Sequence, residues 1–508
     1  MENLFKNKLL LAALLILINV ISHFMPFERA ALAPDDYASL VQSGGMSYSD
    51  ILRQAFKYPD RPLNRIILML QAKLAGDNAA TGLFLVFLSS ATVLLTVFFL
   101  LVKLLGDNFS AFIGSMIFCL LPNKLETFHT SIFFNMNMAI CVYLLSFLLF
   151  IVYTQDFKKI LLIASLFMYA AAIFWYEIGF FLPAVIFTYA IVYKKEAIKP
   201  SLIFAGISVI YLIYRVTGVF GLVAQGGVSH AISVSMLPAN VIDMLHHFFG
   251  RYIIRSALYG GYKFFSIEKP WFLTIVIMDF LLLSAAALWF RKRRLIKIDG
   301  RLLFLAAVIF VSFAAPILLN GKGGVGGRHL ALPSLGVAIF LLWLLERSGR
   351  FQGFTFLALL AVALVISQGN AWTQVVACRI NAAVYENMKQ NKERLIKADS
   401  IVIDTRSFAD NIPFTLINRD FNVLNTYYGA QAFEDWGLIS MAKFVTSNPE
   451  KKVYISISSL EKNKGGYLEF TVAKEEGYRS KSKVIQRVSE KEAVVIGFED
   501  VFGGNFVE

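Results

Sequence analysis

The chain has 508 residues, of which 57% are hydrophobic and 16% are charged, and its mean hydropathy is +0.62. This apolar content excludes an ordinary water-soluble protein and predicts a polytopic membrane protein. The net charge of +13 could suggest a nucleic-acid partner, but residues 374–508 carry 18 basic and 18 acidic side chains. The excess therefore lies in the hydrophobic part, where basic residues cluster between apolar runs, and this pattern argues against nucleic-acid binding.

The first apolar run, Leu9 to Phe27, follows Lys6 and Lys8, which predicts a cytoplasmic N-terminus. Ala31-Leu32-Ala33 also resembles a signal-peptidase site, so the run is either a span or a cleaved signal, with the same downstream topology. Taking about 20 apolar residues as one crossing, we expect about eleven spans. The later runs lie at 82–105, 109–122, 131–153, 159–175, 178–193, 201–217, 271–290, 302–319, 329–345 and 353–371.

Basic residues fall in every second connection between these runs, which places those connections in the cytoplasm. They are Lys103, Lys158, Lys159, Lys194, Lys195, Lys199, Arg291 to Arg294, Lys297, Arg301, Arg347 and Arg350. An odd number of spans from a cytoplasmic N-terminus leaves the C-terminus outside. The sequence thus predicts a protein of the bacterial inner (plasma) membrane.

Residues 1–372 form the predicted membrane domain, with outer loops at 28–81 and 218–270, and residues 373–508 form a separate outer domain. Apolar residues at helical spacing predict a helix over 373–397. Strands are expected at 400–404, 453–457, 467–472, 483–488 and 493–498. We therefore expect an α-helical polytopic membrane protein with a small C-terminal extracytoplasmic α/β domain.

Two features of the sequence limit the kinds of functional site that we expect. Cys378 is the only cysteine in the outer domain, so that domain is expected to be held by packing and not by a disulfide. The sequence has no Cys/His cluster with zinc spacing, no phosphate-binding loop before Lys-Ser/Thr and no Gly-x-Ser-x-Gly turn. Polar residues at the outer ends of the spans are therefore the candidates for a site.

Asp35 and Asp36 form the first candidate, in the loop after the first span. An Asp pair after a proline commonly starts a turn or caps a helix. Near a membrane, the same pair could act as a general base or metal ligand, because partial desolvation raises a carboxylate's affinity for protons.

Three further groups lie at the predicted outer ends of later spans. Glu126 and His129, three residues apart, can share one helical face. Glu177 ends the fifth run, and Arg328 with His329 opens the tenth. Aromatic and charged residues also gather at membrane borders without any catalytic role. Because all three groups lie on the predicted outer face of the membrane, a common site is favoured.

In the long outer connection, residues from Ile242 onward predict one amphipathic helix lying in the membrane interface. Its polar side would carry His247, Arg251 and Arg255, directed toward lipid head groups or a bound phosphate. Asp279 is a separate case: an acid in the middle of the eighth run is costly and marks a functional candidate with no assignable partner.

Together these motifs resemble those of GT-C membrane glycosyltransferases, of the protein O-mannosyltransferase-like and tetratricopeptide-linked branches, over about residues 1–345. The matching segments are Asp35-Asp36 with Arg61-Pro62-Leu63, Pro122 to Glu126, Tyr176-Glu177 with Leu182-Pro183, and Arg328 to Ser334.

The resemblance implies an enzyme that moves a sugar from a polyprenyl-phosphate or diphosphate carrier to the hydroxyl of a glycan, lipid or protein acceptor, with inversion. Asp36 or Asp35 would be the base, Asp36 preferred because it is farther from Pro34. Arg61, Arg251, Arg255 and Arg328 would bind the donor phosphate, since a guanidinium can contact two phosphate oxygens. Glu126, His129, Glu177 and His329 would shape the acceptor site.

No cofactor is implied with certainty, and a divalent metal held by Asp36, Glu126 and His129 stays open. Two other classes also stay open. An O-antigen ligase or polymerase would place its essential Arg and His in a large late loop. A lipid or solute transporter would place paired polar groups at mid-depth.

Overall fold

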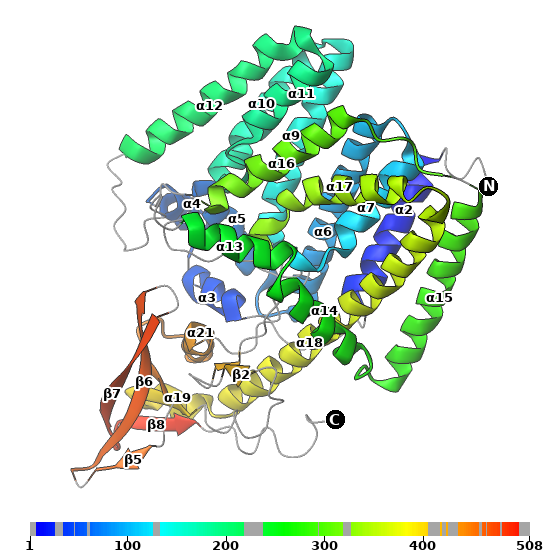
Figure 1. Cartoon of the computed structure of the whole chain (residues 1–508). Coiled ribbons are helices and arrows are strands. Elements are labelled where there is room, and N and C mark those ends of the chain that lie inside the picture. The colour runs from blue at the N-terminus through cyan, green and yellow to red at the C-terminus, as the bar shows by residue number, and fades with distance from the viewer. Residues whose placement is uncertain are drawn as a thin grey trace.

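The computed structural model describes residues 7–25, 34–44, 46–57, 61–124, 133–217, 237–292, 294–318, 327–404, 417–418, 423–424, 435–456, 460–463, 465–477 and 480–496. Each of the predicted apolar runs contains a helix (Figure 1). These helices are α2 (Lys8–Asn19) with the π-helical η1 (Val20–Phe24), α6 (Ala79–Leu105), α7 (Asn108–Leu120), α9 (Phe133–Asp156), α10 (Lys159–Trp175), α11 (Leu182–Tyr193), α12 (Ile198–Thr217), α15 (Lys269–Lys292), α16 (Gly300–Leu318), α17 (Pro333–Arg347) and α18 (Gln352–Gln390).

Within the described ranges, five helical segments are long and apolar enough to cross a membrane: 79–105, 134–156, 195–214, 269–291 and 349–390. Other helices in apolar runs are shorter; α7, with 13 residues, spans only about 20 Å at 1.5 Å per residue. The helices are compatible with an integral membrane protein, whereas the expected count of about eleven crossings is not confirmed.

The bundle is held by a continuous aromatic and aliphatic core. Fully buried phenylalanines from α6, α7 and α9, among them Phe98, Phe112 and Phe147, belong to one cluster that also contains residues of α2, α10, α11, α16, α17 and α18. Close packing of this kind fixes the helix ends relative to one another. The polar residues at those ends therefore have defined neighbours.

The first predicted outer loop folds into three helices: α3 (Pro34–Ser43), α4 (Tyr48–Lys57) and α5 (Pro62–Ala75). Helix α5 starts with a proline, whose missing N–H costs nothing at this position. It ends at Gly76, whose φ of 56° lies in the left-handed region that favours glycine. Asn78 then caps α6 by accepting hydrogen bonds from the N–H groups of Ala80 and Thr81.

The predicted interfacial helix is divided into two helices, α13 (Leu237–Phe248) and α14 (Arg251–Phe264). The prediction of one amphipathic helix was therefore wrong. The break falls at Phe249 and Gly250, and glycine is a weak helix former. Helix α14 packs on α18 through glycine: a Cβ on Gly369 would lie 1.7 Å from the carbonyl oxygen of Gly260. The two backbones therefore touch.

The C-terminal region is an α/β unit. Its central strand, β1 (Ser400–Asp404), pairs in parallel with β4 (Lys452–Ser456) and β8 (Ala493–Ile496). One face of this sheet packs on α18, α19 (Lys392–Lys397) and α21 (Asp435–Val445), and the other packs on the hairpin of β6 (Tyr467–Gly477) and β7 (Ser480–Ser489). The short strands are β2 (Ile417–Asn418), β3 (Val423–Leu424) and β5 (Glu461–Lys462). The five expected strands are confirmed, whereas the helix expected over 373–397 is divided at Asn391, between the end of α18 and α19.

Helix α18, yellow in Figure 1, links the two parts of the molecule. It continues through residue 372 without interruption and contributes Ala377, Val384 and Met388 to the core beneath the sheet. The same core contains Tyr37 and Leu40 of α3 and Ala72 of α5. The first predicted outer loop and the C-terminal region thus lie together at one end of the bundle.

Candidate functional site

Arg61 and Glu177, both predicted site residues, form an ion pair. The Nε of Arg61 donates to Oε2 of Glu177 at 2.7 Å, and an Nη donates to Oε1 at 2.5 Å. The guanidinium also lies over the ring of Tyr176, 4.1 Å from its centroid. The side chains are only 18% and 22% exposed, so this two-point contact is weakly screened by solvent. It joins α5 to η3 (Glu177–Gly179).

A second chain of hydrogen bonds supports this junction. The Nδ2 of Asn135 donates to the carbonyl oxygen of Asn64 at 3.2 Å, and the indole N–H of Trp175 donates to Oδ1 of Asn135. The hydroxyl of Tyr143 donates to the carbonyl oxygen of Tyr176 at 2.6 Å. Asn64, Asn135 and Tyr143 were missed by sequence reasoning. Of these, only Asn135 had a visible signal, as an amide near the start of the apolar run 131–153.

Asp36 lies in the first turn of α3 and is buried, with 8% of its surface exposed. Asp35 lies in the same turn, and its side chain is outside the described part. Both aspartates thus lie near the start of a helix, where acidic residues after a proline complement the helix dipole. The catalytic interpretation stays a prediction.

The buried carboxylate of Asp36 borders a small cleft between α3, α5 and the start of α6. Its walls are formed by Asp36, Ser39, Leu40, Leu68, Gln71, Ala72, Ala75, Gly76 and Gly82. Several of these residues are glycine or alanine, and the space that they leave beside the acid is about that of one water molecule. Gln71 and Arg61 are ten residues apart on α5, or about 15 Å along the helix, so Asp36 and the Arg61–Glu177 pair are separate groups.

Next to Asp36, Tyr37 is 1% exposed and packs against Tyr385 of α18 and Phe444 of α21, with centroid separations of 5.5 and 6.0 Å. Burial raises the pKa of Tyr37 well above its ordinary value, so the phenol stays neutral. Successive residues of α3 therefore face the cleft and the C-terminal core.

The described end of the third run and the start of the tenth run come together. Short helix η2 (Pro122–Lys124) packs against η6 (Gly327–Leu330), and Nδ2 of Asn123 donates to the hydroxyl of Ser334 at 3.1 Å. His329 lies in η6 and is half-buried. Arg328 lies in the same turn, and its side chain is outside the described part, as are those of Arg251 and Arg255 on α14.

Glu126 and His129 lie outside the described residues. Among the residues that the structure does describe, no three His, Cys, Asp or Glu side chains gather in a way that could hold a metal ion. The suggested metal site of Asp36, Glu126 and His129 thus stays a prediction.

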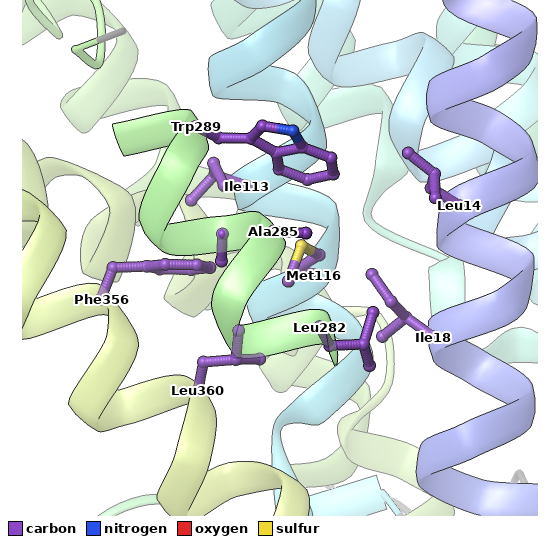
Figure 2. Close-up of a pocket in the computed structure, with 10 residues that line it drawn as sticks. Leu14, Ile18, Ile113, Met116, Leu282, Ala285, Trp289, Phe356 and Leu360 are labelled. Atoms are coloured by element: carbon purple, nitrogen blue, oxygen red, sulfur yellow. The ribbon is translucent and has the colours of Figure 1, made fainter. Parts of the chain in front are cut away.

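Asp279 has a partner that sequence reasoning did not find. Its Oδ1 accepts a hydrogen bond from Nε2 of Gln368 on α18 at 2.7 Å, and both residues are buried. Gln368 was visible in the sequence as an amide in an apolar run, but 89 residues separate it from Asp279, so the pairing was not apparent. A pocket between the helices that carry this pair and α2 and α7 is lined by apolar and aromatic side chains (Figure 2). Trp289, Phe356 and Ile18 are among its lining residues, and none of the lining side chains carries a charge that could bind a phosphate.

The described candidates therefore form three groups, around Asp36, around Arg61 with Glu177, and around His329. Helix α5 connects the first two groups, and η3 and α13 both pack against α16 near the third. No protein-family model matches this sequence, and no curated protein matches it closely enough to be counted as a relative.

Proposed function

We propose that the chain is an integral membrane glycosyltransferase of GT-C type, using a sugar carried on a polyprenyl phosphate or diphosphate. One observation supports this most: a buried carboxylate, Asp36, borders a cleft in the first-loop helices, at the end of the bundle where the C-terminal region packs.

In the proposed reaction, the acceptor hydroxyl attacks the anomeric carbon of the donor sugar. The new carbon–oxygen bond forms as the bond from that carbon to the carrier phosphate breaks, with inversion. The hydroxyl proton passes to Asp36, and the polyprenyl phosphate or diphosphate leaves as an anion. A base within hydrogen-bond reach of the hydroxyl is the requirement for this step, and Asp36 borders the cleft that the acceptor would have to enter.

The donor phosphate is assigned to Arg251, Arg255 and Arg328, on α14 and η6. Arg61 has a different role, because Glu177 already accepts hydrogen bonds from two of its nitrogens. We assign Arg61 and Glu177 to holding α5 on the bundle, which sets the position of the cleft. His329, with Glu126 and His129, is assigned to the acceptor side.

The proposed setting is the bacterial inner membrane, with the N-terminus in the cytoplasm and the C-terminal domain outside. Nucleotide sugars are cytoplasmic, so a donor used on the outer face has to be carried by a lipid. The sequence resemblance and this topology support the assignment together.

The test compares Asp36→Asn with Asp50→Asn in the purified full-length protein supplied with labelled polyprenyl-phosphate sugars. Asp50 is the matched control because it lies in the same loop, in the first turn of α4, and is only partly buried. We expect Asp36→Asn to lose transfer and Asp50→Asn to keep it. Full transfer by Asp36→Asn, with Asp35→Asn also active, would remove the first-loop carboxylates from the reaction.

A second candidate is a lipid or solute transporter, which the Asp279–Gln368 pair favours. A buried acid with an amide partner between two helices is a common feature of substrate pathways through membranes. Asp279→Asn separates the two functions: a transporter would lose flux in proteoliposomes, whereas the proposed transferase would keep its transfer activity.

A further inference from the structure

Tyr385, on the part of α18 that extends into the C-terminal region, contacts a residue next to each of two walls of the Asp36 cleft. Its ring packs on the ring of Tyr37, the residue after Asp36, with centroids 5.5 Å apart. Its hydroxyl donates to Oδ2 of Asp77 at 3.1 Å. Asp77 directly follows Gly76, which lines the opposite wall. One side chain thus bridges α3 and the turn between α5 and α6.

The contact on the α3 side is part of a buried aromatic cluster. Phe444 of α21 lies 6.0 Å from Tyr37 and 6.4 Å from Tyr385, measured between ring centroids. The three rings come from the first loop, from α18 and from α21. Because such clusters resist displacement of any one ring, α3 is attached to the C-terminal core.

The contact on the other side acts on a turn with a well-defined backbone. Gly76 has a φ of 56°, and its N–H donates to the carbonyl oxygen of Ala72 at 2.9 Å. Asn78 caps α6 immediately after it. A hydrogen bond to Asp77 therefore holds a rigid turn and not a flexible loop.

We propose that Tyr385 is a positioning residue that fixes the width of the Asp36 cleft and so couples the C-terminal region to it. Losing the hydroxyl frees the turn between α5 and α6, and losing the ring also frees α3. A ligand that moves the C-terminal region would move Asp36 through the same side chain. The effect on sugar transfer rests on the proposed function, whereas the effect on the cleft does not.

The test uses Ser39→Cys as a reporter, because Ser39 lines the cleft and is 6% exposed. The native cysteines, Cys119, Cys141 and Cys378, are all buried, and the protein without Ser39→Cys gives the background. The reporter is combined with Tyr385→Phe, Tyr385→Ala or Tyr454→Ala, and the rate of maleimide labelling is measured in the full-length protein. Tyr454 is the matched control because it is a tyrosine of the C-terminal sheet that packs on Phe470, on the face away from α3.

With Tyr385→Phe we expect labelling to rise roughly 2- to 10-fold, the change in an opening equilibrium on loss of one net hydrogen bond. Tyr385→Ala should label faster still, and Tyr454→Ala should match the parent. Equal labelling in the parent and Tyr385→Ala would overturn the proposal. So would an equal rise in Tyr454→Ala, because that would reflect general loosening of the C-terminal region.

A transfer assay on the same variants separates this inference from the proposed function. Tyr385→Phe should lower kcat more than it changes KM for the lipid donor, because the hydroxyl bonds the turn that follows the cleft wall and not the donor. If the native protein transfers sugar but labelling is insensitive to Tyr385, the positioning role fails and the function stands. If labelling responds but the native protein consumes no polyprenyl-linked sugar, the function fails and the positioning role stands.

Discussion

The contact between α14 and α18 at Gly260 permits a test with an adjacent control. Gly260 and Gly261 are neighbours within α14. A Cβ at Gly260 would lie 2.5 Å from the carbonyl oxygen of Ile366 and 2.7 Å from Nδ2 of Asn370, whereas a Cβ at Gly261 has nothing within 4 Å. Gly260→Ala and Gly261→Ala therefore add the same methyl group to a closed and an open position.

The expected magnitudes follow from two opposing terms. Replacing Gly by Ala in a helix interior stabilises by about 1 kcal/mol, and this term is common to both variants. Normal contact at Gly260 requires the helices to separate by roughly 1 Å, and the obstructing oxygen is backbone that cannot rotate away. Overpacking of this kind costs about 1–3 kcal/mol, so the two variants should differ by about that amount.

The assay is thermal unfolding of each purified variant in the same detergent. Gly261→Ala should unfold at or above the temperature of the native protein, and Gly260→Ala should unfold below Gly261→Ala. Because membrane proteins often unfold irreversibly, all scans use one heating rate. Equal midpoints for the two variants would refute the close approach of α14 and α18.

Three further predictions use the same measurement. Glu177→Ala should destabilise the protein by about 1–3 kcal/mol, because it leaves the partly buried Arg61 without its two-point partner. The double variant with Arg61→Ala should lose less stability than the sum of the two single variants, and additive losses would contradict a direct pair. Gly106→Ala should lower the stability by about 1 kcal/mol, because Gly106 ends α6 with a φ of 70° that strains an alanine even though a Cβ there has open space. An unchanged midpoint would argue against the left-handed cap. Asn78→Ala should lower the stability by about 0.5–2 kcal/mol, because α6 loses its cap. Asn78→Asp should keep most of that stability, since aspartate also caps helices, and an equal loss in Asn78→Asp would assign the effect to something other than capping.

The elements of this protein could be predicted well from its sequence. Apolar runs and their spacing depend on residues a few positions apart, so every expected run contains a helix and every expected C-terminal strand is present. The helix break at Phe249 and Gly250 was missed because apolar periodicity continued across it, although the glycine was a visible signal.

The contacts that make up the candidate site were decided by the tertiary structure. Arg61 was predicted to bind phosphate, and its pairing with Glu177, 116 residues away, follows only from the docking of α5 against η3. Asp279 had no visible partner until α15 and α18 packed together and brought Gln368 to it.

The surroundings of Asp36 show the same division most clearly. Its position after Pro34, near the start of a helix, could be predicted from neighbouring residues alone. Its burial, its cleft and the attachment of Tyr37 to Tyr385 depend on α3, α5 and α18 meeting at one place. Local patterns specify which segments become helices and strands, whereas contacts across hundreds of residues depend on how whole surfaces fit, and that fit is expressed only in the folded molecule.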